Sequence, residues 1–303
     1  MLRLNYPVYT LDKDVILPAD TVISPEKLGS IISSKSSSPY KSYSLLNHGS
    51  VRQDILMSFQ STHFQTIFSD KDEVAEILSI METLRLVLPV LETMDYFREK
   101  DSYTYQHFLR VFALSTLLAK QLLPDMRERI SLVSAGPTHD VGKMCVPLEI
   151  LKKKTSLTGI ELSILENHAA AGYVLLSYYN NNIESIAGSV ARDHHERRDK
   201  SGYPRGISLN DKITEIIAVS DIYDALVSSR PYRSDPYDNR TALEEITRLA
   251  EKGKLSWDIV KILVACHRKS KLHYTETTVS LEKRGTPPPN NFYGVLAEDD
   301  KDS

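Results

Sequence analysis

The sequence predicts an all-α helical bundle preceded by a small N-terminal unit of α/β or mixed character. Apolar residues recur at three- and four-residue spacing from Val74 onward, which is the period of an amphipathic helix. Strand-like runs are scarce after residue 70. Two short β-leaning runs, residues 6–9 and 15–18, flank a polar turn near the N-terminus, as in a small hairpin.

The composition limits the classes of protein to which the chain can belong. The chain has 303 residues, of which 41% are hydrophobic and 25% charged, so it can bury a substantial core. Its net charge of -3 provides no general attraction for a nucleic-acid polymer or an anionic membrane surface. The most apolar stretch, residues 84–91, contains Arg85 and Pro89 and is far shorter than the ~20 residues of a spanning helix. We therefore expect no membrane association.

The two cysteines, Cys145 and Cys266, stand far apart and belong to no Cys-x-x-Cys pattern. A disulfide framework is not indicated, and a reducing cytoplasm is the simplest location. Asn5 and Pro7 precede any long apolar run, which argues against a secretory signal.

Three segments differ in composition. Residues 1–69 predict a small regulatory or dimerisation unit that ends in a Ser-rich linker, with Ser24-Pro25-Glu26 as a helix start. Residues 70–270 predict the main helical domain. Residues 271–303 are polar and rich in Pro and acidic residues, which predicts a flexible tail.

Several helices can be placed within the main domain. The first runs from residue 70 through Leu88, where Pro89 kinks or ends it. Thr158 and Glu161 form a capping-box pattern that starts another helix, and His168 falls near the end of its apolar run. The remaining helices are expected at about 102–122, 126–135, 183–195, 213–226, 240–252 and 256–269.

Imidazoles and carboxylates gather in the helical middle of the chain, at His107, His139, Asp140, His168, His194, His195 and Asp221. These groups are nitrogen and oxygen ligands for Zn, Fe and Mn. A single histidine on an apolar helix is more often a hydrogen-bonded core residue, so the hypothesis rests on the set.

Two doublets strengthen the metal-site hypothesis. His139-Asp140 precedes Gly142, which is expected to let the chain turn, and Lys143, which can direct a cation back at the doublet. Adjacent side chains on a helix diverge by about 100°, so His194 and His195 can share one metal only near a helix end. The run at 199–204 supplies that break.

The order and spacing of these motifs resemble the HD-GYP family, a branch of the HD-domain metal hydrolases. The resemblance covers roughly residues 95–270, and the matching segments are 103–107, 135–143, 146–151, 157–168 with Gly172, 194–197, 199–204, 219–226 and 230–233. A lone His-Asp pair would be weak evidence, whereas this series is specific.

The resemblance implies an HD-domain helical bundle with a site for two or three metals, usually Fe or Mn. His107, His139, Asp140 and Asp221 would hold one ion, and Asp140 would bridge to a second ion completed by His168, His194 and His195. The three-metal variant carries Glu where this chain has Tyr103. Because tyrosine is a poor substitute ligand, we expect two divalent ions.

The resemblance also implies a phosphodiesterase that hydrolyses cyclic di-GMP to pGpG, GMP or both through attack by a metal-bridging hydroxide. Asp140 and Lys143 would be catalytic, and the substrate contacts would come from Lys143, Tyr203, Arg230 and Arg233. The alternatives are an exposed basic loop for the two arginines and a purely structural role for Tyr203, which would fix the turn.

One departure and two alternative functions accompany this interpretation. Lys200 stands where the family signature has glycine, so a positive φ there would strain the backbone. The alternatives are an HD-type hydrolase of another cyclic dinucleotide or nucleotide, and a weakly catalytic module that binds cyclic di-GMP and signals. The partners that we consider are cyclic di-GMP, a second copy of the chain in a homodimer, and signalling proteins.

Overall fold

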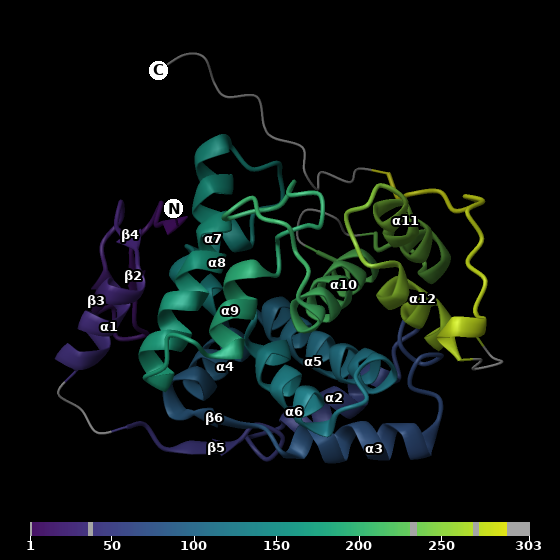
Figure 1. Ribbon diagram of the computed structural model, residues 1–303, viewed down its shortest axis with the longest axis horizontal. Helices are drawn as coiled ribbons and strands as arrows, with labels where there is room; N and C mark the ends of the chain where they lie inside the picture. Colours follow the sequence, from purple (N-terminus) through teal and green to yellow (C-terminus); the bar gives the residue numbers. More distant parts are fainter. Residues whose placement is uncertain (1, 36–38, 231–234, 269–272, 290–303) are drawn as a thin grey trace.

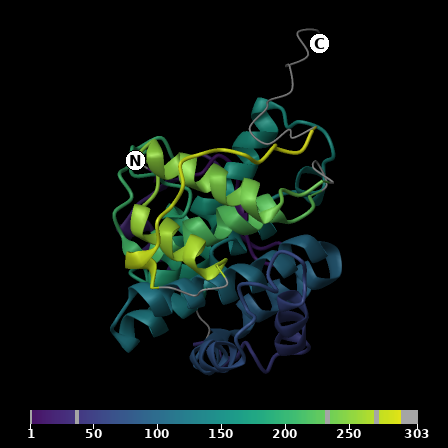
Figure 2. The same ribbon diagram turned by 90° about the vertical axis from the view of Figure 1, so that its right-hand side faces the viewer.

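The computed structural model describes all residues except 1, 36–38, 231–234, 269–272 and 290–303. The N-terminal unit lies on one side of a helical body, and the last two helices lie on the opposite side (Figure 1). The same arrangement seen from its right-hand side is shown in Figure 2. The predicted fold class, a helical bundle with a small mixed unit, is confirmed.

The N-terminal unit consists of two short antiparallel pairs and one helix. Strand β1 (Leu2–Arg3) pairs with β4 (Val22–Ile23), and β2 (Val8–Tyr9) pairs with β3 (Val15–Leu17). Helix α1 (Pro25–Ser34) begins where predicted, with the Ser24 hydroxyl accepting a hydrogen bond from the Lys27 amide at 3.2 Å. Helix α1 then packs against the long helix α8 (Gly159–Asn180) of the main body.

The prediction of one helix from residue 70 through Leu88 is wrong. Helix α3 (Lys71–Glu82) ends early, strand β6 (Arg85–Val87) pairs with β5 (Ser42–Ser44), and α4 (Leu88–Lys100) starts anew. Pro89 lies in the first turn of α4, where its missing N–H leaves no hydrogen bond unmade. The apolar spacing continues across the junction because both helices bury their apolar faces in the same core.

Helix α5 (Ser102–Leu122) is the central element, with the bounds that the sequence predicts. It contacts α2 (Val51–Phe59), α3, α4, α6 (Met126–Ala135) and α10 (Lys212–Val227). Its face with His107, Val111, Leu114 and Leu118 is completely buried. The prediction that these residues share one face is confirmed, and His107 lies inside the core.

The remaining elements carry the other candidate ligands. Helix α8 has the predicted capping box at Thr158 and Glu161. It continues to Asn180, so His168 lies near its middle rather than near its end. The other elements are η1 (Gly136–Thr138), η2 (Val141–Cys145), α7 (Leu148–Leu151), α9 (Ile186–Asp193), α11 (Asn239–Glu251), α12 (Trp257–Cys266) and η3 (Tyr274–Glu276).

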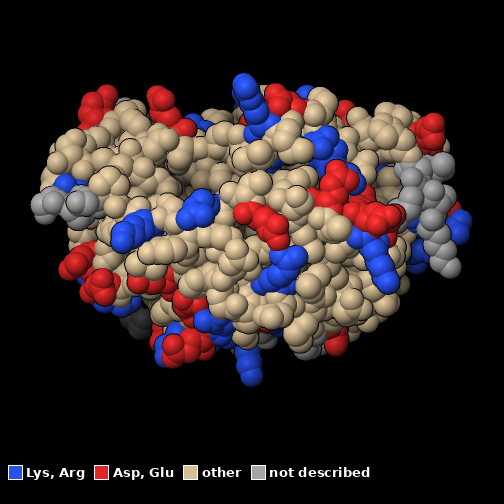
Figure 3. Space-filling view, turned by 90° about the horizontal axis from the view of Figure 1, so that it is seen from below, with Lys and Arg blue, Asp and Glu red and all other residues tan. Residues whose placement is uncertain are grey.

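Lys, Arg, Asp and Glu are interspersed over the face shown in Figure 3, where neither sign of charge dominates. Among the described residues, no helix combines the length and apolarity needed to cross a bilayer.

Candidate metal centre

All seven side chains that the sequence singles out as ligands converge in the core. They form two groups whose candidate ligand atoms lie within 4.8 Å of one another: His107, His139 and Asp221 in one, and Asp140, His168, His194 and His195 in the other. They come from α5, the η1–η2 junction, α8, the end of α9 and α10. Segments more than a hundred positions apart therefore meet at one centre.

Asp140 lies between the two groups and directs one oxygen toward each. Its Oδ2 is 3.3 Å from His107 Nε2 and 3.4 Å from His139 Nε2. Its Oδ1 is 3.1 Å from His168 Nε2 and 3.6 Å from His194 Nε2. Asp221 Oδ1 completes the first group at 3.2 Å from His107 Nε2. This geometry allows Asp140 to contact two ions at once.

Breaks in the helices let neighbouring residues of each doublet share the centre. Asp140 separates the two 3₁₀ turns that flank it, and its own backbone leaves the helical region. His194 is the residue at which α9 ends, and His195 follows it. Both pairs thus avoid the divergence of adjacent side chains on a regular helix, as expected for the second doublet.

Gly142 has a different role from the expected turn, because its φ is not positive. A Cβ atom at this position would lie 2.0 Å from the His168 carbonyl oxygen and 2.5 Å from the Gly172 nitrogen. Glycine is therefore required so that η2 can pack directly against the backbone of α8. This close approach brings the His139-Asp140 doublet to His168.

The hydrogen bonds behind the imidazoles fix which ring nitrogen carries a proton. Nδ1 of His139, His168 and His194 lies 2.7, 2.6 and 3.0 Å from the carbonyl oxygens of Gly136, Leu165 and Ala191, respectively. A carbonyl can only accept, so each Nδ1 donates. In the neutral ring, Nε2 then carries the lone pair that is directed at the centre.

The donor set fits divalent cations. The His168 and His194 Nε2 atoms are 3.5 Å apart, and His195 Nε2 is 3.0 Å from His168 Nε2. The buried Asp140 Oδ1 accepts no hydrogen bond from any described residue, although His168 Nε2 is close. Converging lone pairs repel one another unless a cation lies among them, and nitrogen and carboxylate donors suit Zn, Fe and Mn.

The electrostatics of the two groups differ. Burial opposes a positive charge on His107, but the carboxylates of Asp140, Asp221 and Asp224 outweigh it and raise the pKa to about 10. Burial lowers the pKa of His168 and, together with the neighbouring imidazoles, lowers that of His195 well below its usual value. These shifts favour the neutral imidazole for His168 and His195, the form in which histidine binds metals.

The carboxylates of the centre remain ionised despite their burial. Burial alone would raise the pKa of Asp140, but Lys143 and the imidazoles hold it well below its usual range. The same opposition, with His107 as the first stabilising partner, holds the pKa of Asp221 low. Lys143 Nζ lies 2.5 Å from Asp140 Oδ2, so this lysine points its cation back at the doublet, in accordance with the prediction.

Among the described residues, Tyr203 and Arg230 are two of the predicted substrate contacts. The Tyr203 ring stacks on the His195 ring at 4.5 Å between centroids and 19° between planes. The Arg230 guanidinium lies over the Tyr103 ring at 5.2 Å, and Tyr103 is parallel to the His107 ring at 6.1 Å. Arg233 lies outside the described residues.

Sequence reasoning missed Asp224, which is fully buried behind the first group. His107 Nδ1 lies 2.7 Å from Asp224 Oδ2, and the carboxylate also pairs with Arg110 and accepts a bond from Ser228 Oγ at 3.1 Å. The signal was present, because Asp224 follows Asp221 by three residues and Arg110 follows His107 by three. On a helix, such residues share a face.

Glu196 was also missed, and it organises the loop after His195. Its fully buried carboxylate accepts hydrogen bonds from the Arg205 amide at 2.7 Å and the Ile207 amide at 3.0 Å. Gly202 packs tightly against the backbone of His195 and Glu196, since a Cβ there would lie 2.3 Å from the His195 carbonyl oxygen. Both features hold Tyr203 against the His195 ring.

Comparison with known proteins identifies the family. A family model described as an HD domain matches residues 93–256. The chain belongs to the HD-domain family. The matched HD domain contains every ligand candidate named above, from His107 to Asp221, and the family recognised from the sequence motifs is confirmed.

Several curated relatives are similar to the HD domain. A cyclic di-GMP phosphodiesterase of Thermotoga maritima is 36% identical over 168 residues, 55% of this chain and 45% of that protein. A second, PA4108 of Pseudomonas aeruginosa, is 38% identical over 51% of this chain and 36% of its own length. The 3'3'-cGAMP-specific phosphodiesterase 1 of Vibrio cholerae is 31% identical over 68% of this chain and 45% of its own. The chain spans less than half the length of these relatives.

Proposed function

We propose that this HD domain is a phosphodiesterase that hydrolyses cyclic di-GMP to pGpG, GMP or both, with two divalent ions, Fe or Mn, as cofactors. The observation that carries the proposal is the convergence of seven side chains on one centre with Asp140 between two ligand groups. The similarity to relatives named as cyclic di-GMP phosphodiesterases supports the choice of substrate.

The two groups of side chains support an assignment of ligand roles. We assign His107, His139, Asp140 and Asp221 to one ion, and Asp140, His168, His194 and His195 to the other. When bound, such an ion pair supplies Lewis acidity to phosphate oxygens and lowers the pKa of a water molecule toward neutrality. The hydrogen bonds from Nδ1 to backbone carbonyls hold the ring orientations in advance, so little reorganisation is needed.

The substrate would approach from the side of Asp221 and Lys143. The Asp221 and Lys143 side chains are 11% and 15% exposed, whereas those of His107, His139 and His194 are completely buried. Lys143 would hold a phosphate oxygen and carry a proton beside Asp140. Arg230 and Arg233 would contact phosphates, for which guanidinium suits bidentate binding, and Tyr203 would line the site beside His195.

Metal analysis and product analysis on the same preparation test the proposal. Protein purified without oxygen should contain two divalent ions per chain and convert cyclic di-GMP to linear product. His139→Ala and Asp140→Ala should lose both metal and turnover, while the exposed Glu128→Gln variant should retain both. Full turnover by either ligand variant would overturn the site assignment, and three ions per chain would overturn the two-metal assignment.

A mixed cyclic dinucleotide is the second candidate substrate, because the relative named as 3'3'-cGAMP-specific matches 68% of this chain. Rates on the two cyclic dinucleotides under identical conditions distinguish the candidates. Tight binding of cyclic di-GMP without any product from metal-loaded protein would instead indicate the signalling module.

We also propose a cytoplasmic location, supported by two buried free cysteines, Cys145 and Cys266, as expected in a reducing compartment. For residues 1–69 we propose a regulatory or dimerisation role, with residues 70–270 as the catalytic domain. Of the predicted tail, residues 271, 272 and 290–303 lie outside the described residues. Light scattering on the full chain and on a chain lacking the first 69 residues tests dimerisation.

A further inference from the structure

A cavity lies between the N-terminal unit and helices α4 and α8. Its volume is about 560 Å³, within the range of small-molecule sites, about 300–1,000 Å³. The loop between β2 and β3, the end of α1, the start of α4 and the end of α8 form its walls. None of the seven candidate metal ligands lines it, so it is distinct from the metal centre.

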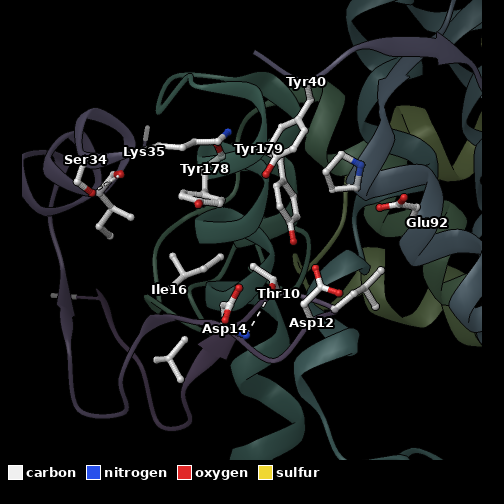
Figure 4. A pocket seen from close by; sticks show the side chains of 14 residues that line it. Thr10, Asp12, Asp14, Ile16, Ser34, Lys35, Tyr40, Glu92, Tyr178 and Tyr179 are labelled. Atoms are coloured by element: carbon white, nitrogen blue, oxygen red, sulfur yellow. Dashed lines mark hydrogen bonds between the residues drawn. The ribbon is translucent and has the colours of Figure 1, made fainter. Parts of the chain in front are cut away.

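The hydroxyl group of Tyr179 points into this cavity without a partner. The side chain is only 3% exposed, and Figure 4 shows its oxygen directed toward Thr10 and Asp12. No described residue forms a hydrogen bond with this hydroxyl. The oxygen itself is not one of the buried atoms that lack a partner, so it is open to the cavity and available to a ligand as donor or acceptor. Its ring is fixed edge-on against Tyr40 at 5.8 Å.

The aromatic faces of the cavity already accommodate a cation. The Lys35 ammonium lies 4.0 Å from the centre of the Tyr40 ring and 4.8 Å from that of Tyr178, and it approaches Tyr40 in Figure 4. Ring faces attract ammonium groups through the quadrupole of the π-system. The rings are therefore positioned for cation binding, and Lys35 occupies part of that position.

The charges around the cavity favour a cation as well. Asp12, Asp14 and Glu92 line it, and Lys35 is the single residue of opposite charge among the described residues that line it. A cavity with an excess of one sign concentrates ligands of the other sign. The aliphatic side chains of Val15, Ile16, Ile31 and Pro89 complete the walls and suit a short hydrocarbon chain.

We propose that this cavity binds a small aliphatic amine with two protonated amino groups. One ammonium would lie against the Tyr40 and Tyr178 rings and displace Lys35. The Tyr179 oxygen would accept a hydrogen bond from the amine, the carboxylates of Asp12, Asp14 and Glu92 would neutralise its charge, and the methylene groups would contact the aliphatic walls. The proposal is independent of the chemistry at the metal centre.

Calorimetric titration of the metal-loaded full chain with putrescine tests this site, with 1,4-butanediol as the neutral ligand of matched length. We expect binding of the diamine and none of the diol. Because Asp12, Asp14 and Glu92 are exposed, affinity should fall severalfold as salt rises from low to physiological concentration. Absence of diamine binding, or equal binding of the diol, would overturn the proposal.

Three variants and one control locate the site. Tyr179→Phe and Glu92→Gln should each weaken putrescine binding severalfold, because one removes the hydrogen bond and the other a charge. Lys35→Met should strengthen it severalfold by vacating the ring faces, whereas a site for anions would lose affinity. Glu128→Gln, an exposed position on α6, should change nothing. Binding that none of the first three variants alters would place the amine elsewhere and refute the assignment.

Discussion

The two halves of the metal centre differ in one supporting group. In the first half, His139 is backed by a backbone carbonyl, but His107 is backed by the carboxylate of Asp224, which is itself paired with Arg110. In the second half, His168 and His194 are backed by backbone carbonyls. A carboxylate makes the imidazole a stronger base, whereas a carbonyl mainly fixes its orientation. Metal binding in the first half should therefore depend more on a supporting charge than metal binding in the second half.

Replacing Asp224 by Asn should have the largest effect that distinguishes the halves. We expect about 10- to 100-fold weaker binding of one ion, the range typical for groups that support metal-bound histidines, with smaller changes at the other ion. The buried Arg110 would also lose its charged partner, so thermal stability should fall. Chelator competition with quantitative metal analysis measures the two ions separately.

Ser228→Ala is the matched control for Asp224→Asn. It removes the hydroxyl that donates to Asp224 Oδ1 at 3.1 Å but leaves the carboxylate charge behind His107. Metal affinity should fall less than in Asp224→Asn, since the charge behind His107 is kept and only one hydrogen bond to it is lost. If Asp224→Asn weakened both ions equally, the halves would not differ as proposed.

The pH dependence of metal loading should also differ between the halves. Without metal, the carboxylates hold the pKa of His107 at about 10, so an ion in the first half must displace a proton. Its affinity should rise by up to about tenfold per pH unit toward pH 10. The imidazoles of His168 and His195, whose pKa values are lowered, need release no proton at neutral pH.

The raised pKa of His107 also determines the direction in which the stability of the metal-free protein should change with pH. Because its folded pKa lies above the ordinary 6.5, the metal-free protein should gain full stabilisation below about pH 6.5 and lose it as pH rises toward 10. Thermal unfolding of metal-free and metal-loaded protein across this window tests the claim. A metal-free protein that became more stable over that range would contradict it.

The sequence predicts the candidate ligands better than it predicts the groups that support them. Chemistry-bearing residue types in a fixed order identify His107 through Asp221, and capping patterns place the start of α1 and of α8. The continuous apolar spacing across Pro89 conceals a helix boundary, because two helices share one core. The role of Gly142 depends on a neighbour in another helix, which local sequence does not reveal.

The cavity between the N-terminal unit and helices α4 and α8 could not be predicted from local sequence either. Its walls come from residues within 10–16, 31–35, 89–92 and 178–179 and from Tyr40, and no single segment carries a recognisable motif. By contrast, Asp224 could have been found, because three-residue spacing places it on one face of α10 with Asp221. Local periodicity can therefore identify supporting groups that lie on the same helix as a ligand. It cannot identify groups that only packing brings together.

Tyr203 tests the support of the second half beyond its carbonyls. Removing the ring by Tyr203→Ala should weaken metal retention there by severalfold, because stacked rings contribute about 0.5–1.5 kcal/mol. Tyr203→Phe keeps the stack on His195 and should retain the metal. If Tyr203→Phe retained metal but lost turnover, its hydroxyl would serve substrate binding. Equal metal retention in all three proteins would show that carbonyls alone suffice.

The smallest expected effect concerns the loop of the second half, at Lys200. This residue has φ of +67°, a conformation that costs a side chain about 1 kcal/mol relative to glycine. Replacement by glycine also loosens the unfolded chain, so we expect a net stabilisation of roughly 0.5 kcal/mol. Lys200 is exposed, so metal content should not change. Denaturant unfolding at fixed metal content measures the difference.

Gly206 allows the reverse substitution, from glycine to a residue with a side chain, in the same loop. Its φ is +62°, and a Cβ there would meet only the Lys200 carbonyl oxygen, at an ordinary 3.7 Å. Gly206→Ala should therefore destabilise the protein by about 1 kcal/mol through backbone conformation alone. If Lys200→Gly instead destabilised the protein, a contact of the lysine would outweigh its strain. The loop would then hold Lys200 for a reason other than the backbone, and a charge beside the substrate would be the explanation to test next.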